Sequence, residues 1–376
     1  MNFLFSDDQQ TIAGLVAKIL SDRVTDEFRR DFAGRGEPYD RELWSTLAEA
    51  GMLGVALPEA CGGSGMGMVE LCLMLQAQGH CLAPVPLLST LVAGAMPIAE
   101  FGSASQQQRY LGAVVAGETV LTAALGELGK APQALVFEAA DSADKWVLSG
   151  TAEAVPYARQ AAAILLPARI GDEMALFVVD RQTPGVALTD QHTTNGEPVA
   201  RLALDDVELD SEALLCRGPE GWAWLEHHVL VAAAALQLGV AEEALRRTAQ
   251  YTSERRQFGQ PISSFQAVAH RAADGYIDLE AMRSTLWQAA WRLAQGLPAT
   301  AEVRAARWWA SEGGYRIAHS AQHLHGGIGA DVDYPLHRFF LWAKQLELLG
   351  GGARAQMATL GRQLTDAARK ELAPTH

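Results

Sequence analysis

The chain has 376 residues, of which 49% are hydrophobic, so it can bury a core large enough for two or three domains. Its formal net charge of -14, without any run of Lys or Arg, argues against binding to nucleic acid or to an anionic membrane surface. None of the four cysteines forms a CxxC pair, which favours free thiols in a reducing cytosol.

Residues 1–117 are expected to be helical. Asp40 is a candidate N-cap for a helix with Leu43, Trp44 and Leu47 on one face, and Gly51 is expected to end it. The N-terminus has no basic segment followed by a long apolar core, so no signal peptide is expected. We therefore predict a soluble, cytoplasmic protein that begins with a helical domain.

Residues 118–218 have a different pattern, in which short apolar runs alternate with turn residues such as Pro184-Gly185 and Asn195-Gly196. This spacing is typical of a β-sandwich or β-barrel, so we predict a central β domain. The runs are Val120-Leu121, Leu135-Val136-Phe137, Trp146-Val147-Leu148, Ala163-Ile164-Leu165-Leu166, Leu176-Phe177-Val178-Val179 and Leu202-Ala203-Leu204.

Residues 219–376 return to helical periodicity and predict a four-helix bundle. The first helix is expected from about residue 222 to residue 253. Its apolar run, Val229 to Val240, is too short to span a membrane and indicates a buried helix. The second helix is expected to carry Phe265, and the third to follow Pro298 with Thr300 as N-cap. A fourth helix is expected to start at Asp333-Tyr334-Pro335, and a fifth to follow Gly350-Gly351-Gly352.

Several familiar catalytic motifs are incomplete. Gly62-Gly63-Ser64-Gly65 is followed by Met66, so the second glycine of a GxSxG nucleophile motif is missing. No GxGxxG follows a predicted strand, which argues against a Rossmann dinucleotide site. His319 and His323 share a predicted helix face, but the glutamate of HExxH and a third ligand are absent, so we predict no metal site.

Two segments of the bundle suit a phosphate-bearing cofactor. Arg255 lies beside the tight turn at Gly259, where a fixed guanidinium could grip a pyrophosphate and Phe258 could pack on a flat ring. The isolated string fits equally well a helix end with a solvated arginine pair. Gly326-Gly327 adds backbone N–H groups that could approach a phosphate closely.

Together with two N-terminal segments, these residues resemble the acyl-CoA dehydrogenase family over nearly the whole chain. The matching segments are Leu57-Pro58-Glu59-Ala60-Cys61-Gly62-Gly63-Ser64-Gly65, Gly102 to Glu118, Glu254 to Gly259 with Gln266, and His325 to Gly329 followed by Tyr334-Pro335, Arg338 and Ala343-Lys344. The resemblance implies an α-β-α architecture and FAD-dependent oxidation of an acyl-CoA thioester to the trans-2-enoyl-CoA, with a carboxylate as base.

The resemblance also implies a tetramer in which each FAD is shared. The isoalloxazine ring lies on the β domain of one subunit, and the neighbour's bundle contacts the ADP half. The residues that match the ADP-half positions are Arg255, Phe258, Gln266, Gly326 and Gly327, and His323 stands where the family usually has Gln.

The ring half of the site matches poorly. The family's TEPxxGSD loop aligns with Gly126 to Gln133, and its WITN segment with Ala154-Val155-Pro156-Tyr157, so the aromatic and hydroxyl groups that flank the flavin are missing. Gly350 replaces the usual catalytic Glu, and Val229 takes the alternative position of the base on the first bundle helix. Glu226 and Glu347, each one turn before a vacant position, are weak candidates for a relocated base.

The half of the FAD site that matches the family is the ADP half, which a subunit of the family lends to its neighbour. The favoured hypothesis is a base-less, non-catalytic subunit of a heterotetramer that acts on an acyl-CoA with a catalytic partner. The alternatives are a self-sufficient homo-oligomeric dehydrogenase with a relocated base, a flavin oxidase or monooxygenase, and a CoA-binding protein without redox turnover.

Overall fold

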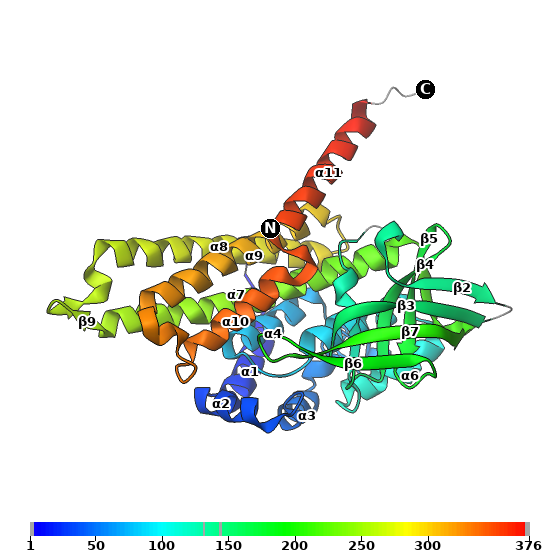
Figure 1. The fold of residues 1–376 in the computed structure, drawn as a ribbon, viewed down its shortest axis with the longest axis horizontal. Helices are drawn as coiled ribbons and strands as arrows, with labels where there is room; N and C mark the ends of the chain where they lie inside the picture. Colours follow the sequence, from blue (N-terminus) through cyan, green and yellow to red (C-terminus); the bar gives the residue numbers. More distant parts are fainter. Residues whose placement is uncertain (1–3, 131, 143–144, 373–376) are drawn as a thin grey trace.

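The computed structural model describes residues 4–130, 132–142 and 145–372, arranged as a helical region, a β region and a helical bundle (Figure 1). The first strand begins at Leu121 and the last strand before the bundle ends at Arg217. The predicted order of helical domain, β domain and bundle is therefore confirmed, while the domain limits at 117/118 and 218/219 stay a proposal.

The N-terminal region packs helices around apolar faces such as that of α3, on which Leu43, Trp44 and Leu47 are buried. Asp40 caps α3 by accepting a hydrogen bond from the Leu43 amide, as predicted, and Gly51 follows the helix with a positive φ of 74°. The helices are α1 Asp7–Arg23, α2 Asp26–Arg35, α3 Arg41–Glu49, α4 Met68–Cys81, a π-helix Leu88–Ala95, α5 Met96–Phe101 and α6 Ala104–Val115.

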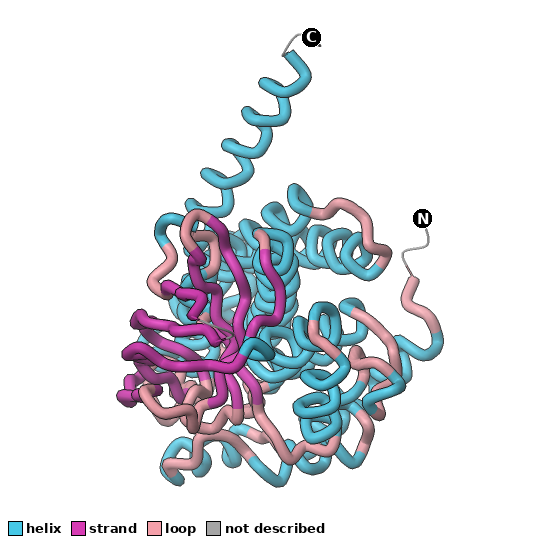
Figure 2. The backbone as a smooth tube through the Cα atoms, turned by 90° about the vertical axis from the view of Figure 1, so that its right-hand side faces the viewer, coloured by secondary structure: helices cyan, strands magenta, loops and turns pink. Residues whose placement is uncertain are grey.

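Eight described strands form one curved sheet in the order β6-β7-β3-β2-β4-β5-β8, with β1 parallel to β4 (Figure 2). Phe137, Leu148 and Phe177 belong to a separate apolar core of this sheet. The strands are β1 Leu121–Ala123, β2 Glu138–Ser142, β3 Lys145–Pro156, β4 Ala163–Ile170, β5 Glu173–Asp180, β6 Val186–His192, β7 Pro198–Asp210 and β8 Leu214–Arg217.

The C-terminal bundle is built on α7, a helix of 36 residues. Its apolar window passes the length and hydropathy test for a membrane span, but 89% of that window is buried inside the molecule. The elements are α7 Pro219–Glu254, the hairpin of β9 Arg256–Gln257 and β10 Gln260–Pro261, α8 Gln266–Ala294, α9 Thr300–His325, α10 Leu336–Leu348 and α11 Gly352–Leu372. Figures 1 and 2 show α11 projecting away from the body of the molecule.

Two local predictions were wrong. Leu135-Val136-Phe137 is not a strand, because the Val136 amide donates to the carboxylate of Glu127 at 3.2 Å instead of joining a ladder. The run is apolar because Leu135 and Phe137 are buried. Thr300 is the first residue of α9 and not its N-cap, since the chain enters the helix at Ala299.

The helices α4 and α7 cross at two glycines that face each other's backbones. A methyl group added at Gly79 would lie 2.1 Å from the Leu236 carbonyl oxygen, and one added at Gly239 would lie 1.9 Å from that of Gln76. Only hydrogen atoms fit at both positions, so the close crossing fixes where α7 lies against the N-terminal helices.

We expect Gly239→Ala to lower the free energy of unfolding by about 2 kcal/mol or more, because the added methyl must push two buried backbones apart. Gly14→Ala is the matched control, since Gly14 is an exposed position within α1 with nothing within 4 Å of the added carbon. The free energy of unfolding of this control should rise by about 0.5–1 kcal/mol, because Ala has a higher helix propensity than Gly. Urea denaturation measures both variants. Equal stability of the two variants would contradict the close crossing.

Candidate functional site

The first candidate segment forms a hairpin at the end of α7, at the extremity of the molecule farthest from the sheet (Figure 1). Phe258 and Gly259 form its turn with φ angles of 52° and 82°, and Phe258 is 91% exposed. Arg255 and Gln266 are also exposed, and neither side chain has a hydrogen-bond or ion-pair partner within the described part of the chain. The hairpin therefore offers an uncommitted cation and an aromatic ring to a ligand.

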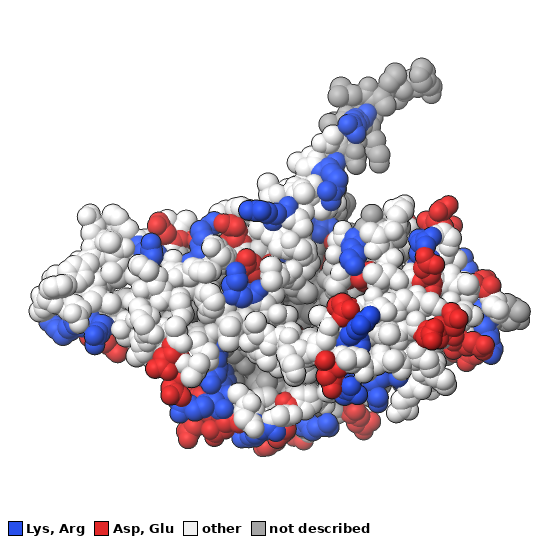
Figure 3. Space-filling model, in the orientation of Figure 1, with Lys and Arg blue, Asp and Glu red and all other residues white. Residues whose placement is uncertain are grey.

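The charge of the surface differs between this tip and the rest of the molecule. On the face drawn in Figure 3, acidic and basic side chains alternate over the sheet and the N-terminal helices, so the net charge of -14 is not gathered in one patch there. The tip of the bundle is mostly uncharged on the same face, with basic side chains along its lower edge. An anionic ligand at the tip therefore meets little electrostatic repulsion from this face.

The second segment follows α9 and lies beside the end of α7. The ring of His325 stacks on that of Tyr251 with centroids 4.3 Å apart, and Tyr251 is four residues before Arg255. Gly326 turns the chain with a φ of 66°, and carbons added at Gly326 or Gly327 would meet nothing within 4 Å. Two signatures about 70 residues apart in sequence thus meet at one end of the bundle.

His323 lies one turn before Gly326 on α9, and its Nδ1 is 2.7 Å from a guanidinium nitrogen of Arg271 on α8. His319, which could have shared a metal with His323, instead contacts the rings of Tyr315 and Phe340. Among residues 4–130, 132–142 and 145–372, no cluster of three His, Cys, Asp or Glu side chains is arranged to hold a metal ion.

These residues fit the ADP half of FAD. The exposed Arg255 can pair with a pyrophosphate, the bare Gly326 and Gly327 leave room for a phosphate near the backbone, and Phe258 presents an uncovered face. The sequence suggested these residues as candidates because each belongs to a local motif.

Gly350, which the family resemblance aligned with the usual catalytic carboxylate, lies in the short 3-10 helix Leu349–Gly351 between α10 and α11. Its φ is 69°, and a carbon added there would lie 2.5 Å from Cδ2 of Leu230. Leu230 comes from α7 and is fully buried, as is Val229 beside it. A side chain at position 350 would therefore require the buried Leu230 side chain to move.

A buried polar network occupies the rest of this centre. Arg304 of α9 donates two hydrogen bonds to Glu226, at 3.0 and 2.9 Å, and a third to Oε1 of Gln356 at 2.9 Å. Gln356 in turn donates to the Gly350 carbonyl at 2.7 Å. Both oxygens of Glu226 are thus held by a guanidinium, and no local pattern in the sequence pointed to Arg304.

The other candidate base is also engaged. Glu347 forms an ion pair with Lys344 at 2.6 Å on the same helix. The fully buried Arg307 donates to the Leu349 carbonyl at 2.7 Å and also contacts the carbonyls of Leu346 and Glu347. Burial lowers the pKa of Arg307 to about 10, so the guanidinium stays charged at neutral pH and fixes the end of α10.

The segments aligned with the family's ring-binding loops are occupied by internal contacts. Glu127 is buried and accepts hydrogen bonds from Lys130 at 2.8 Å and from the Val136 amide. A carbon added at Gly129 would lie 3.6 Å from the Glu226 carboxylate, so this loop packs over the network. Ala131 of the aligned loop lies outside the described residues.

A groove of 660 Å³ runs between α2, the β6–β7 turn and the outer face of α10. Tyr157, at the end of the segment aligned with WITN, lines it together with Arg159, Asp190, Glu197 and Arg338. Burial raises the pKa of Glu197 to about 7, and no other side chain forms a hydrogen bond or ion pair with its carboxylate within the described residues. Because the Glu197 carboxyl has no cation partner, its negative charge when ionised would repel a phosphate, so this groove is a poor phosphate site.

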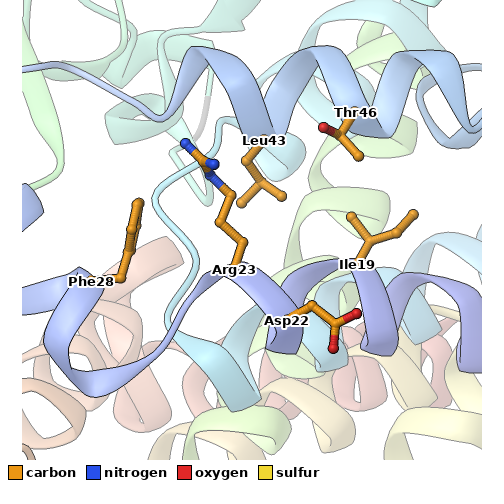
Figure 4. Close-up of a pocket in the computed structure, with 6 residues that line it drawn as sticks. All are labelled: Ile19, Asp22, Arg23, Phe28, Leu43 and Thr46. Atoms are coloured by element: carbon orange, nitrogen blue, oxygen red, sulfur yellow. The ribbon is translucent and has the colours of Figure 1, made fainter.

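A smaller pocket between α1 and α3 lies in the N-terminal region (Figure 4). Its arginine, Arg23, is already paired with Asp40 and with Glu42 at 2.8 Å. This pocket is therefore explained by the ion pair that holds the two helices together.

The comparisons with known proteins agree with this geometry. Residues 6–118 match the model of the acyl-CoA dehydrogenase N-terminal domain, and residues 221–365 match that of the C-terminal domain. The chain belongs to the acyl-CoA dehydrogenase family. Members of this family bind FAD, and FAD is the cofactor of this fold.

Individual relatives cover almost the entire chain. The acyl-CoA dehydrogenase FadE27 of Mycobacterium tuberculosis is 41% identical over 97% of this chain and 99% of its own length. A chain of the ChsE4-ChsE5 complex from the same species superposes with a TM-score of 0.92 at 41% identity, covering all of both chains. A variant of the Tcur3481-Tcur3483 steroid ACAD gives a TM-score of 0.90 at 44% identity over 96% of this chain and 99% of that one.

We expect Gly350→Ala to destabilise the fold by about 1–3 kcal/mol, because the methyl group meets Leu230 and the positive φ disfavours a side chain. Leu230→Ala makes room for that methyl group, so the two substitutions together should cost less than the sum of their separate effects in urea denaturation. Strictly additive losses would show that Leu230 does not fill this position.

We expect Glu197→Gln to raise the stability at alkaline pH. A carboxyl with a raised pKa in the folded state stabilises the fold only while protonated, and this contribution is lost as the pH rises from about 4.5 through about 7. The unfolding free energy of Glu197→Gln should exceed that of the wild type by about 1 kcal/mol at pH 8, with a smaller difference at pH 5. The control Glu59→Gln, at an exposed position, should show no such trend.

Proposed function

We propose that this chain is the non-catalytic subunit of a two-subunit acyl-CoA dehydrogenase, and that it lends the ADP-half site to an FAD whose ring lies in a catalytic partner. When bound, FAD accepts the hydride from the β-carbon of the acyl-CoA. In this proposal Arg255, Phe258, Gln266, His323, Gly326 and Gly327 hold the ADP half, and the partner provides the base.

The observation that supports this proposal is the separation of the two half-sites along α7. Leu230, beside the vacant base position, and Arg255 are 25 residues apart, which is about 38 Å at the usual rise of an α-helix. One extended dinucleotide is too short to join them. The ADP-half residues of this chain therefore serve a flavin whose ring is on another subunit.

The state of the chain's own reaction centre favours a partner with a different sequence over a second copy. Leu230 fills the space at Gly350, and the Glu226 carboxylate is held by Arg304. Glu347 is paired with Lys344. A second copy would bring the same closed centre to the shared flavin, so a homo-oligomer would have no carboxylate free to take the α-proton.

The comparisons support the same assignment. Similar chains occur in the ChsE4-ChsE5 complex and in the Tcur3481-Tcur3483 steroid ACAD, each of which is named for two components. We propose that this chain forms a heterotetramer in the cytoplasm. A steroid-linked acyl-CoA is the first substrate class to test.

The test compares the chain alone with the chain co-expressed with an acyl-CoA dehydrogenase homologue encoded nearby. We expect the chain alone to be colourless and the complex to be yellow and bleached by acyl-CoA. A flavin-containing, acyl-CoA-reducible sample of the chain alone would overturn the proposal in favour of a relocated base.

Within the complex, Arg255→Ala should weaken FAD binding about tenfold to a hundredfold, because a charge-assisted contact with the pyrophosphate is lost. Arg354→Ala, which removes another exposed arginine, from α11, is the matched control and should retain FAD. Flavin fluorescence on dilution measures both affinities. Equal affinity of the two variants would remove Arg255 from the site.

A further inference from the structure

Arg271 links the two helices that bear the ADP-half residues. It lies on α8, five residues after Gln266, and its guanidinium is 2.7 Å from Nδ1 of His323 on α9. His323 is three residues before Gly326. Both side chains are exposed, so the contact lies at the surface where a ligand would bind.

The chemistry of this contact fixes the state of the imidazole. A guanidinium has donors and no acceptor, so Nδ1 of His323 must accept the hydrogen bond. The proton of the neutral ring is then on Nε2, and the hydrogen bond holds the ring so that this N–H points away from Arg271. His323 is thereby prepared as a donor.

Other histidines of the chain have the opposite arrangement. Nδ1 of His228 donates to the Trp224 carbonyl at 2.7 Å, and Nδ1 of His325 donates to the Ala321 carbonyl at 2.8 Å, each within its own helix. On those rings the proton is on Nδ1 and Nε2 is an acceptor. Without Arg271, His323 could bond in the same way to the carbonyl of His319 on its own helix, four residues earlier, and would then lose its outward donor.

We propose that Arg271 is a positioning residue of the ADP-half site, which holds the His323 ring with Nε2–H toward the ligand. This inference rests on the proposed function and extends it. It explains how an imidazole can replace the amide of the family's usual Gln: the amide always has donors, whereas the imidazole has an outward donor only in one tautomer and one ring orientation.

The test is a double-mutant cycle on FAD affinity in the complex with the catalytic partner. Arg271→Ala should weaken FAD binding about threefold to tenfold, as expected for one hydrogen bond that is no longer aligned. His323→Gln restores an amide donor that needs no orienting partner, so Arg271→Ala should have no further effect in that background. Arg271→Gln keeps a donor for Nδ1 and should bind FAD almost as well as the wild type.

Two outcomes of the cycle would overturn the inference. An equal loss on Arg271→Ala in both backgrounds would mean that Arg271 contacts FAD directly, and no loss in either would mean that it does not act on the site.

A second measurement needs neither FAD nor the partner. In the isolated chain labelled with ¹⁵N at its ten histidines, His323→Gln identifies the signals of His323. These signals should show the Nε2–H tautomer in the wild type and a mixture of tautomers in Arg271→Ala. An unchanged tautomer would overturn the role of Arg271, whereas a complex that fails to bind FAD despite the expected tautomer shift would count against the proposed function alone.

Discussion

The position of α7 constrains both half-sites, and its crossing with α4 sets that position. At Gly79 and Gly239 each helix faces the other's backbone, so neither can shift without a clash. The helix then runs from Leu230, which packs against Gly350, to the hairpin at Arg255. Because a packed helix of this length is a stiff rod, the two half-sites cannot approach each other within one chain. The geometry of this one element therefore supports the proposal that the flavin is shared between chains.

The surroundings of Gly350 are closely packed and leave little space for a catalytic side chain. Burying Glu226 and Arg304 carries a desolvation penalty, which the two-point pairing and the hydrogen bond to Gln356 offset. Leu230 fills the space that a side chain at position 350 would need. The positive φ of Gly350 is also costly for any other residue. Packing, charge pairing and backbone conformation therefore stabilise the same closed arrangement.

The sequence predicted the architecture and suggested candidate residues for the ADP half, because both depend on local signals. Helical periodicity, the turn at Gly259 and the pair Gly326-Gly327 can all be read from neighbouring residues. The closed reaction centre could not be predicted in this way. Arg304, Gln356 and Glu226 lie far apart in the sequence and meet only through the packing of α7, α9 and α11. An arginine on a helix is usually exposed, and nothing near Arg304 indicates that it is buried. The apolar run at Leu135 was wrongly predicted to be a strand for a related reason. A short apolar run is found both in strands and in buried loops, so the run alone does not distinguish them.

The two half-sites differ in solvent exposure as clearly as they differ in their match to the family's motifs. Around Gly350, Glu226 is paired with the buried Arg304, and Arg307 holds the adjacent helix end. The residues proposed for the ADP half are at the surface, with Phe258 almost fully exposed. An exposed aromatic ring on a protruding hairpin gains nothing for the isolated chain, and it raises the risk of non-specific association. Such a ring is stabilising only when another surface covers it. The same feature that makes the hairpin unfavourable in a monomer makes it suitable for contact with a neighbouring subunit and its flavin.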